Sequence, residues 1–389
     1  MQNRFVESLE NRSMFAISIG GISIDIPGGL DIPGIDIPDI PGLGDDANVA
    51  EVATARRKSA GVPALAVATM KDGKLDEVAV VGTRKAGDAT RARWADEFLI
   101  GSATKAMTAT LAARLVERGY IKWTSKLVDF FPGFAAGNKI RAQYLNVTLE
   151  QMLAHRSGLP HSLTTEQTVA SAIASGTPMQ VRNNFLRSIL KLKPDNAVGG
   201  YNYSDAGYIV AGAMIETAMK EPYENLMQRL VFKPLGMETA GFGWPGTEGT
   251  LDQPRAHDAL GNSYPPNAIN KFPAIFNPSG GVHTSIIDWS KFVGVQLGTM
   301  PKKFLTADTV KKLRTPFPGG GTNYGLGWNV IDIGPVEVIQ HDGTDGNWYA
   351  SVTVVPDTDR AVLVVTNRGG LAGERAAHGV LQDLQGRLY

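Results

Sequence analysis

Strand-forming segments occur near both ends of this chain, whereas its middle carries mostly helical patterns and loops. Two strand patterns, residues 64–70 and 77–83, flank the turn residues Asp72 and Gly73. Three more follow near the end, at 336–340, 348–355 and 361–366. A sheet built from both ends must carry the intervening residues as an insertion. We therefore expect an α/β (α+β) fold with a sheet flanked by helices, an inserted and mostly helical lobe, and a cleft between the lobes.

Helix signals divide the rest of the chain. Asp45 or Asp46 is a candidate cap for a helix that ends near Ala60, before Gly61. A second helix begins at Ser102, with apolar residues four positions apart and Gly119 as its stop. Further helices are expected from the capping box at Thr148–Gln151, from Asp205 as N-cap to about Lys220, and over 372–387.

These patterns set the expected domain boundaries. Residues 46–389 form one domain, with 46–110 and 300–389 in the sheet lobe and 111–299 in the helical lobe. Residues 1–45 form an N-terminal extension in which Ile-Pro recurs at 26–27, 32–33, 37–38 and 40–41. Because proline fixes φ and lacks an N–H donor, we expect extended chain there. It is either a tail or a wrap over the body, or a segment for self-association or partner binding.

Composition excludes several classes of protein. Lys+Arg and Asp+Glu both total 38, so the chain lacks the basic excess of most nucleic-acid-binding proteins. Cysteine is absent, which rules out disulfides, thiolate zinc sites and a cysteine nucleophile. No P-loop, H-E-x-x-H or G-x-S-x-G motif occurs, and the histidines lack metal-ligand spacing, so we expect neither cofactor nor metal.

The compartment follows less directly from the sequence. The apolar stretch 13–24 lacks a positive flank, since Glu7 and Glu10 precede it, and no clear cleavage site follows. No apolar run approaches the length of a membrane span. We expect a cytoplasmic protein, with export to the periplasm as the alternative.

The first chemical motif is Ser102-Ala-Thr-Lys105. Residues three apart share one helix face, so the lysine amine can reach the serine hydroxyl. A serine needs a neighbour that takes its proton, and burial lowers a lysine pKa toward that task. A serine at a helix start is also a common cap, so this motif alone decides nothing.

Two further motifs follow along the chain. Tyr201-Asn-Tyr203-Ser-Asp205 places phenols before a helix start, and a phenol near an ammonium can be shifted toward phenolate. His341-Asp-Gly343 lies between strand patterns, where glycine lets a substrate approach an edge strand. Each also fits a turn or a hairpin without catalysis. The remaining histidines are expected to be structural or exposed: His155, His161, His257, His283 and His378. Three aromatic residues fit either the cleft or the core: Trp328, Trp348 and Tyr349.

Taken together and in this order, the three motifs resemble those of the penicillin-recognising serine hydrolases, in the class C-like branch. That branch includes class C β-lactamases, D-alanyl-D-alanine carboxypeptidases, D-aminopeptidases and family VIII carboxylesterases. Six blocks, spread over roughly residues 50–389, carry the resemblance: Phe98–Lys105, Leu153–Leu159, Tyr203–Tyr208, Phe232–Met237, Pro278–Gly281 and Tyr324–Trp328. It implies a β-lactamase/transpeptidase-like fold with an antiparallel sheet.

The resemblance also implies roles for individual residues. Ser102 would be the acylated nucleophile, Lys105 would tune the proton transfers, and Tyr203 would be the general base and would protonate the leaving group. The backbone N–H groups of Ser102 and Thr344 would form the oxyanion hole. His341 and Gly343 would lie on the edge strand beside the substrate.

Two departures from the family pattern bear on the substrate. Asp205 stands where asparagine is common, and an acid there can pair with Lys105 or bind a substrate ammonium. His341 stands where many members have lysine, and a neutral imidazole suits a substrate carboxylate less. We therefore expect an esterase of short acyl esters acting on a small-molecule ester or amide. The alternatives are a D-aminopeptidase or DD-peptidase with weak β-lactamase action, and a catalytically silent binding or assembly protein.

Overall fold

The computed structural model describes residues 37, 40, 43, 47–134, 140–267, 272–319, 322–333 and 336–389. The expectations for most of the N-terminal extension, and for Asp45 and Asp46 as caps, fall outside these residues. The first described helix, α2 (Val49–Ala60), is capped by Asn48, whose side chain and that of Glu51 form a capping box. Gly61 ends it in the left-handed conformation, as the sequence predicts.

The sheet is built from both ends of the chain, which confirms the predicted fold class. Six strands of the described chain lie in the order β2-β1-β11-β10-β9-β8, and every neighbouring pair is antiparallel. Their bounds are β1 (Ala64–Lys71), β2 (Lys74–Gly82), β8 (Asn329–Ile333), β9 (Val336–Thr344), β10 (Tyr349–Val355) and β11 (Arg360–Thr366). The sequence patterns did not predict β8, which pairs with β9 at the sheet edge.

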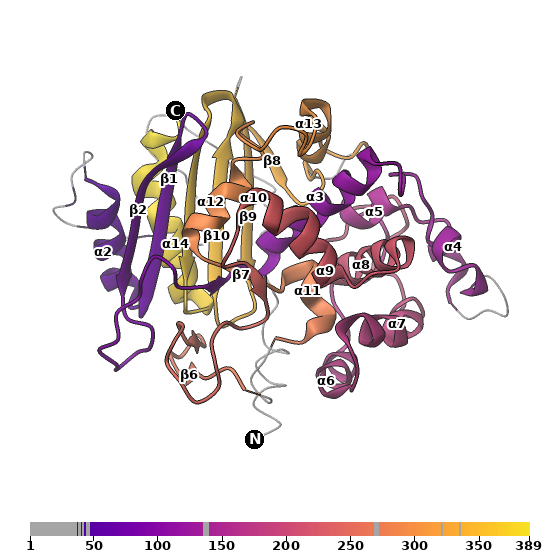
Figure 1. Ribbon diagram of the computed structural model, residues 1–389, viewed down its shortest axis with the longest axis horizontal. Helices are drawn as coiled ribbons and strands as arrows, with labels where there is room; N and C mark the ends of the chain where they lie inside the picture. Colours follow the sequence, from indigo (N-terminus) through magenta and orange to yellow (C-terminus); the bar gives the residue numbers. More distant parts are fainter. Residues whose placement is uncertain are drawn as a thin grey trace.

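Alternating side chains give the sheet two apolar faces. Along β1, Ala64, Ala66 and Ala68 belong to the larger core, whereas Leu65 and Val67 belong to a second cluster. Helix α2 and the C-terminal helix α14 (Gly370–Leu384) cover the face of the second cluster (Figure 1). Helix α12 (Ile286–Val293) packs on the opposite face, although its residues fall within the segment that the sequence assigns to the helical lobe.

Of the remaining helices, all but α10 lie beside the sheet, to the right in Figure 1. The remaining helices are α3 (Thr104–Glu117), α4 (Leu127–Phe130), α5 (Leu149–Leu153), α6 (Thr165–Ile173), α7 (Pro178–Ile189), α8 (Asp205–Met219), α9 (Tyr223–Met227), α10 (Lys233–Leu235), α11 (Asn277–Gly280) and α13 (Ala307–Arg314). A π-helical turn over Gln228–Phe232 joins α9 to α10. Short strands β3 (Phe98–Leu99), β7 (Val282–Thr284) and β4 (Gly241–Phe242) form a small second sheet, and β5 (Ala256–His257) pairs with β6 (Ser263–Tyr264).

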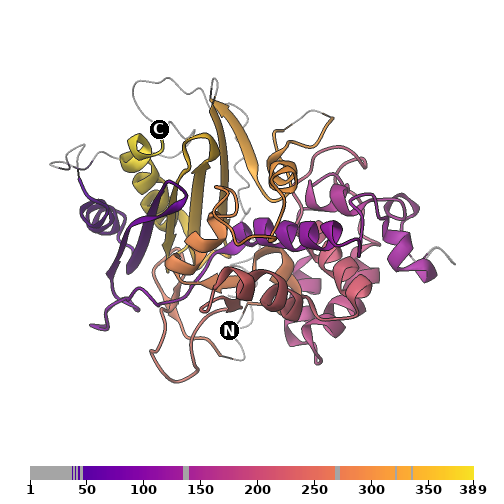
Figure 2. The same cartoon turned by 45° about the horizontal axis from the view of Figure 1, so that its top comes forward.

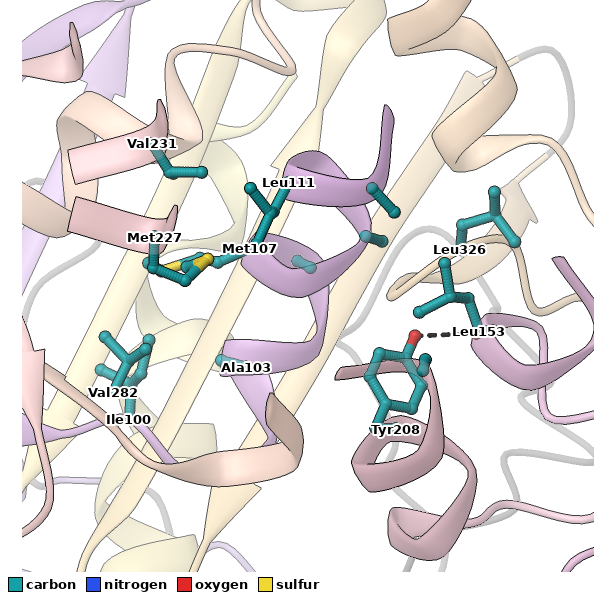
Figure 3. Close-up of a cluster of buried hydrophobic side chains, with 14 of the residues drawn as sticks. Ile100, Ala103, Met107, Leu111, Leu153, Tyr208, Met227, Val231, Val282 and Leu326 are labelled. Atoms are coloured by element: carbon teal, nitrogen blue, oxygen red, sulfur yellow. Dashed lines mark hydrogen bonds between the residues drawn. The ribbon is translucent and has the colours of Figure 1, made fainter. Parts of the chain in front are cut away.

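Helix α3 runs from the sheet into the helical region, as the view in Figure 2 shows. Its residues from Thr104 to Leu115 are all buried. In Figure 3, Met107 and Leu111 point toward Met227 and Val231. Leu153, Tyr208 and Leu326 lie on another side of the helix, where the Tyr208 hydroxyl donates to the Leu153 carbonyl. A helix packed on all sides holds its first turn in a fixed place between sheet and helices.

Candidate active site

Ser102 lies in a 3-10 turn, Gly101–Ala103, that leads directly into α3. It is half-buried, whereas its neighbours Gly101 and Ala103 are buried. The helix predicted to begin at Ser102 therefore begins as α-helix two residues later, at Thr104. A serine at this place presents its hydroxyl beside the first backbone N–H groups of a buried helix, where partial positive charge accumulates.

Lys105 is fully buried and holds the site together. Its ammonium donates to Ser102 Oγ at 2.9 Å, to Asp205 Oδ1 at 2.6 Å and to the Ser279 carbonyl at 2.8 Å. Three partners use all three donors of an ammonium group. Burial lowers the pKa of Lys105, and the nearby Asp205 carboxylate opposes that shift. The acid at 205 is therefore engaged by Lys105, one of the two roles considered for it from the sequence.

Helix α8 begins at Asp205, and the residue before it is its N-cap. Ser204, not Asp205, is the N-cap, because its hydroxyl accepts the Gly207 N–H. The predicted cap at Asp205 is wrong: its side chain faces Lys105, and a serine hydroxyl satisfies the free helix donor instead. This shift leaves Tyr203 just outside the helix.

Tyr203 lies beside both members of the first motif. The Ser102 hydroxyl is near enough to its phenol to favour a lower phenol pKa, and Lys105 Nζ lies 4.8 Å from its ring centroid. Burial, together with the negative charge of Asp205, raises the pKa of Tyr203 well above its usual value. The expectation that the lysine shifts this phenol toward phenolate is wrong here, because burial and Asp205 outweigh the ammonium. Tyr203 is a neutral phenol at neutral pH.

Strand β9 passes very close to the turn that carries Ser102. A Cβ atom on Gly343 would lie 2.0 Å from the Ile100 carbonyl oxygen and 2.7 Å from Ser102 N. A Cβ on Gly101 would lie 2.4 Å from Thr344 N. Only glycine permits such an approach of two backbones. The glycine of the third motif thus lets the backbone of β9 at Thr344 approach the backbone at Ser102.

His341 is 2% exposed and turns both ring nitrogens toward protein groups. Its Nδ1 lies 2.6 Å from the Asp342 carbonyl oxygen, and its Nε2 lies 3.1 Å from the Tyr324 hydroxyl. Burial and the charge of Lys105 lower the pKa of His341 to about 4. The ring is therefore neutral at pH 7, with the proton on Nδ1 and the Tyr324 hydroxyl donating to Nε2.

Asp342, the next residue of β9, points to the face of the sheet opposite His341 and connects β9 to β10 and α14. Its carboxylate accepts from Ser351 at 2.5 Å and from Tyr349 at 3.3 Å, and lies 3.0 Å from His378 Nε2 on α14. Burial lowers the pKa of His378, but the Asp342 carboxylate outweighs it, so the pKa is raised. This ion pair fastens the strand to α14.

The other residues considered from the sequence lie either in the core or outside the three motifs. Trp328 and Trp348 are buried core residues, and Tyr349 packs on the second cluster near His378. His257 and His283 each contact a backbone carbonyl outside the motifs. Nδ1 of His161 lies 3.2 Å from the Tyr203 carbonyl oxygen.

Sequence reasoning missed one residue inside this group. His155, expected to be structural or exposed, is fully buried against the ring of Tyr203, with ring centroids 4.2 Å apart. Its block, Leu153–Leu159, was recognised as similar to the family, but the pattern gave no sign that the imidazole faces the second motif.

Comparisons with known proteins identify the family of this chain. A family model described as Beta-lactamase matches residues 49–387. Penicillin-binding protein 4 of Amycolatopsis lactamdurans is 26% identical over 345 residues, which cover 84% of this chain and 86% of that protein. Unguisins hydrolase ungD of Aspergillus violaceofuscus (strain CBS 115571) is 25% identical over 311 residues, 69% of this chain but 52% of the relative, so the match spans about half of that protein.

A solved structure shows the same fold. The octameric penicillin-binding protein homologue from Pyrococcus abyssi superposes with a TM-score of 0.68 at 22% identity, covering 87% of this chain and 78% of that one.

Among the described residues, no helix is long and apolar enough to cross a membrane.

Proposed function

This chain belongs to the beta-lactamase family of serine hydrolases, and from that premise we propose that it hydrolyses short acyl esters without a carboxylate, through an acyl-enzyme on Ser102. The observation that carries the proposal is the hydrogen bond from Lys105 to Ser102 Oγ at 2.9 Å, with the Tyr203 phenol near the same hydroxyl. A nucleophile beside two proton-handling groups is the arrangement that acyl transfer needs.

The proposed first step follows from the neutral state of Tyr203. Ser102 Oγ attacks the ester carbonyl carbon, and its proton moves to the Tyr203 oxygen. The phenol proton moves in turn to the leaving alkoxide as the ester C–O bond breaks. A neutral phenol can relay a proton in this way without first ionising. Water then attacks the acyl-enzyme, with the proton path reversed, and releases the acid.

The remaining groups would stabilise charge. The amides of Ser102 and Thr344 would donate to the developing oxyanion, in a place fixed by the backbone approach at Gly101 and Gly343. Lys105, held as an ammonium by Asp205, would lower the energy of negative charge on Ser102 and Tyr203.

Charge also supports the choice of substrate. The positive charge of Lys105 is balanced by Asp205 at 2.6 Å, and His341 is neutral at pH 7 because its pKa is about 4. Neither side chain therefore offers a free positive charge to a substrate carboxylate, which penicillins and C-terminal peptides carry.

Peptide-like amides are the second candidate. Relatives named penicillin-binding protein 4 and unguisins hydrolase support it, as does the neutral phenol of Tyr203, which can protonate an amine leaving group. D-Aminopeptidase, DD-peptidase or weak β-lactamase action would then be the main activity. A silent protein used for binding or assembly is a third reading. The octameric homologue supports self-association.

One panel tests these candidates. Purified protein is given short nitrophenyl esters, D-amino-acid anilides and nitrocefin, and a fluorescent fluorophosphonate reports the reactive serine. We expect the esters to be hydrolysed fastest. Ser102→Ala should lose the label and about a thousandfold or more of the turnover while keeping the fold. A Ser102→Ala protein as active as the wild type would refute the assignment, and faster anilide or nitrocefin turnover would select the second candidate.

A further inference from the structure

His155 adopts a backbone conformation that residues with side chains rarely take. Its φ is +58°, in the left-handed region, just after α5 and its C-cap Ala154. Such a conformation costs about 1–2 kcal/mol for a residue other than glycine. Strained backbone conformations of this kind are common at functional sites, where the surrounding structure maintains them.

The conformation lets His155 hold the chain on both sides of Tyr203. Its carbonyl oxygen accepts the Asn202 N–H at 2.9 Å. Its ring nitrogen Nδ1 accepts the Ser204 N–H, also at 2.9 Å. Asn202 and Ser204 are the two neighbours of Tyr203 in the chain, so a single residue binds the backbone amide before the tyrosine and the one after it.

Only one form of the imidazole can make this contact. Nδ1 must be unprotonated to accept from Ser204, so the ring proton is on Nε2. Burial and the charge of Lys105 lower the pKa of His155 well below its usual value, which keeps the ring neutral. Nε2 is buried and has no hydrogen-bond partner among the described residues. An unmade bond of this kind costs about 1–3 kcal/mol, so packing alone would favour an apolar side chain here.

We propose that His155 is the positioning residue for Tyr203, setting the place of the phenol relative to Ser102. This inference rests on the proposed function, in which Tyr203 moves the proton. The ring centroids of His155 and Tyr203 lie 4.2 Å apart, so the imidazole also limits how the phenol can tilt. A displacement of about 1 Å at such a group can cost about a hundredfold in rate.

The loops around His155 remain joined without the imidazole. Asn202 Nδ2 donates to the Leu159 carbonyl at 2.8 Å, and the Ser204 hydroxyl donates to the Pro160 carbonyl at 2.6 Å. Variants at 155 are therefore expected to fold, and their effect should appear in turnover.

Three substitutions separate the acceptor from the backbone conformation. His155→Asn tolerates a positive φ and places an amide oxygen where Nδ1 lies, so it should keep most of the activity. His155→Gly tolerates the same φ but has no acceptor. His155→Gln carries its amide too far out to meet the Ser204 N–H. We expect the glycine and glutamine variants to lose about 10- to 100-fold in kcat for a nitrophenyl ester and in the rate of fluorophosphonate labelling, with KM little changed.

Combination with Tyr203→Phe shows whether the effect passes through the tyrosine. A residue that acts by placing the phenol should cost little more once the phenol oxygen is gone, so His155→Gly should barely slow labelling of the Tyr203→Phe protein. Equal slowing in both backgrounds would overturn the inference, and so would a His155→Gly protein as fast as the wild type. A wild-type protein that neither hydrolyses substrates nor takes the label would instead overturn the proposed function, and this inference with it.

Discussion

Lys105 Nζ lies 2.6 Å from Asp205 Oδ1, and this buried ion pair joins the first turn of α3 to the first turn of α8. Both side chains lie almost wholly out of solvent, with 0% and 5% of their surfaces exposed. The pair fixes the distance between the serine motif and the tyrosine motif. Its two charges also act on the neighbouring groups: Lys105 donates to the Ser102 hydroxyl, and Asp205 helps raise the pKa of Tyr203.

Asp205→Asn should make the site lose activity at lower pH. The Asp205 carboxylate raises the pKa of both Lys105 and Tyr203, so its removal lowers both. Because the proposed mechanism uses the ammonium and the neutral phenol, we expect the falling limb of the kcat/KM profile for a nitrophenyl ester to move to lower pH. An unchanged limb would mean that neither group controls it. The variant also tests stability, because losing one partner of a buried pair costs up to about 3–5 kcal/mol when the other stays charged.

Tyr203→Phe should slow ester turnover far more than Tyr201→Phe does. Of these two tyrosines, Tyr203 is the one whose phenol is near the Ser102 hydroxyl, whereas the guanidinium carbon of Arg156 lies 5.4 Å from the ring centroid of Tyr201. General acid–base help is worth about 100- to 10,000-fold, and that loss is expected for Tyr203→Phe alone. Steady-state kinetics of both proteins, with melting temperatures as a fold control, make the comparison. Equal activities would place the proton transfer on another group.

His341→Lys should shift preference toward substrates with a carboxylate. The buried neutral imidazole would be replaced by a cation on β9, and a hydrogen bond between such a charged group and a carboxylate is worth about 1–3 kcal/mol. The measurement is the ratio of kcat/KM for nitrocefin to that for a short nitrophenyl ester, in wild type and variant. If the ratio does not change, position 341 does not face the substrate carboxylate. A wild type that prefers nitrocefin would contradict the esterase proposal itself.

His378 should stabilise the fold in a pH-dependent way. Its pKa is raised in the folded protein, since the Asp342 carboxylate outweighs burial and Glu374 adds to the effect. Its charged contribution is therefore complete below about pH 6.5, the unfolded pKa, and is lost as pH rises through the folded pKa. His378→Gln should lower the free energy of unfolding more at pH 6 than at pH 9, by about 1 kcal/mol. Urea unfolding at both pH values checks this, and an equal loss at both would contradict it.

Local patterns were enough for much of the architecture. The β1–β2 hairpin, the last two strands, the capping box at Thr148 and the stop at Gly61 appear where the sequence predicts them. These signals are contained in a few adjacent residues, since alternation, caps and glycine turns act over short distances. The cap of α8 was misplaced by one residue because Ser204 and Asp205 are both good caps, and the contact with Lys105 selects between them.

The sequence by itself determined the order of the three motifs, the family and the parts of the chain that build the sheet. Only the tertiary structure decided that Tyr203 is a neutral phenol, that His155 binds the amides on either side of it, and that Asp342 pairs with His378. The reason is physical. A pKa depends on burial and on charges brought close by folding, and His155 meets Ser204 from 49 positions away in the chain. Contacts of this range leave no periodicity that a sequence pattern could record.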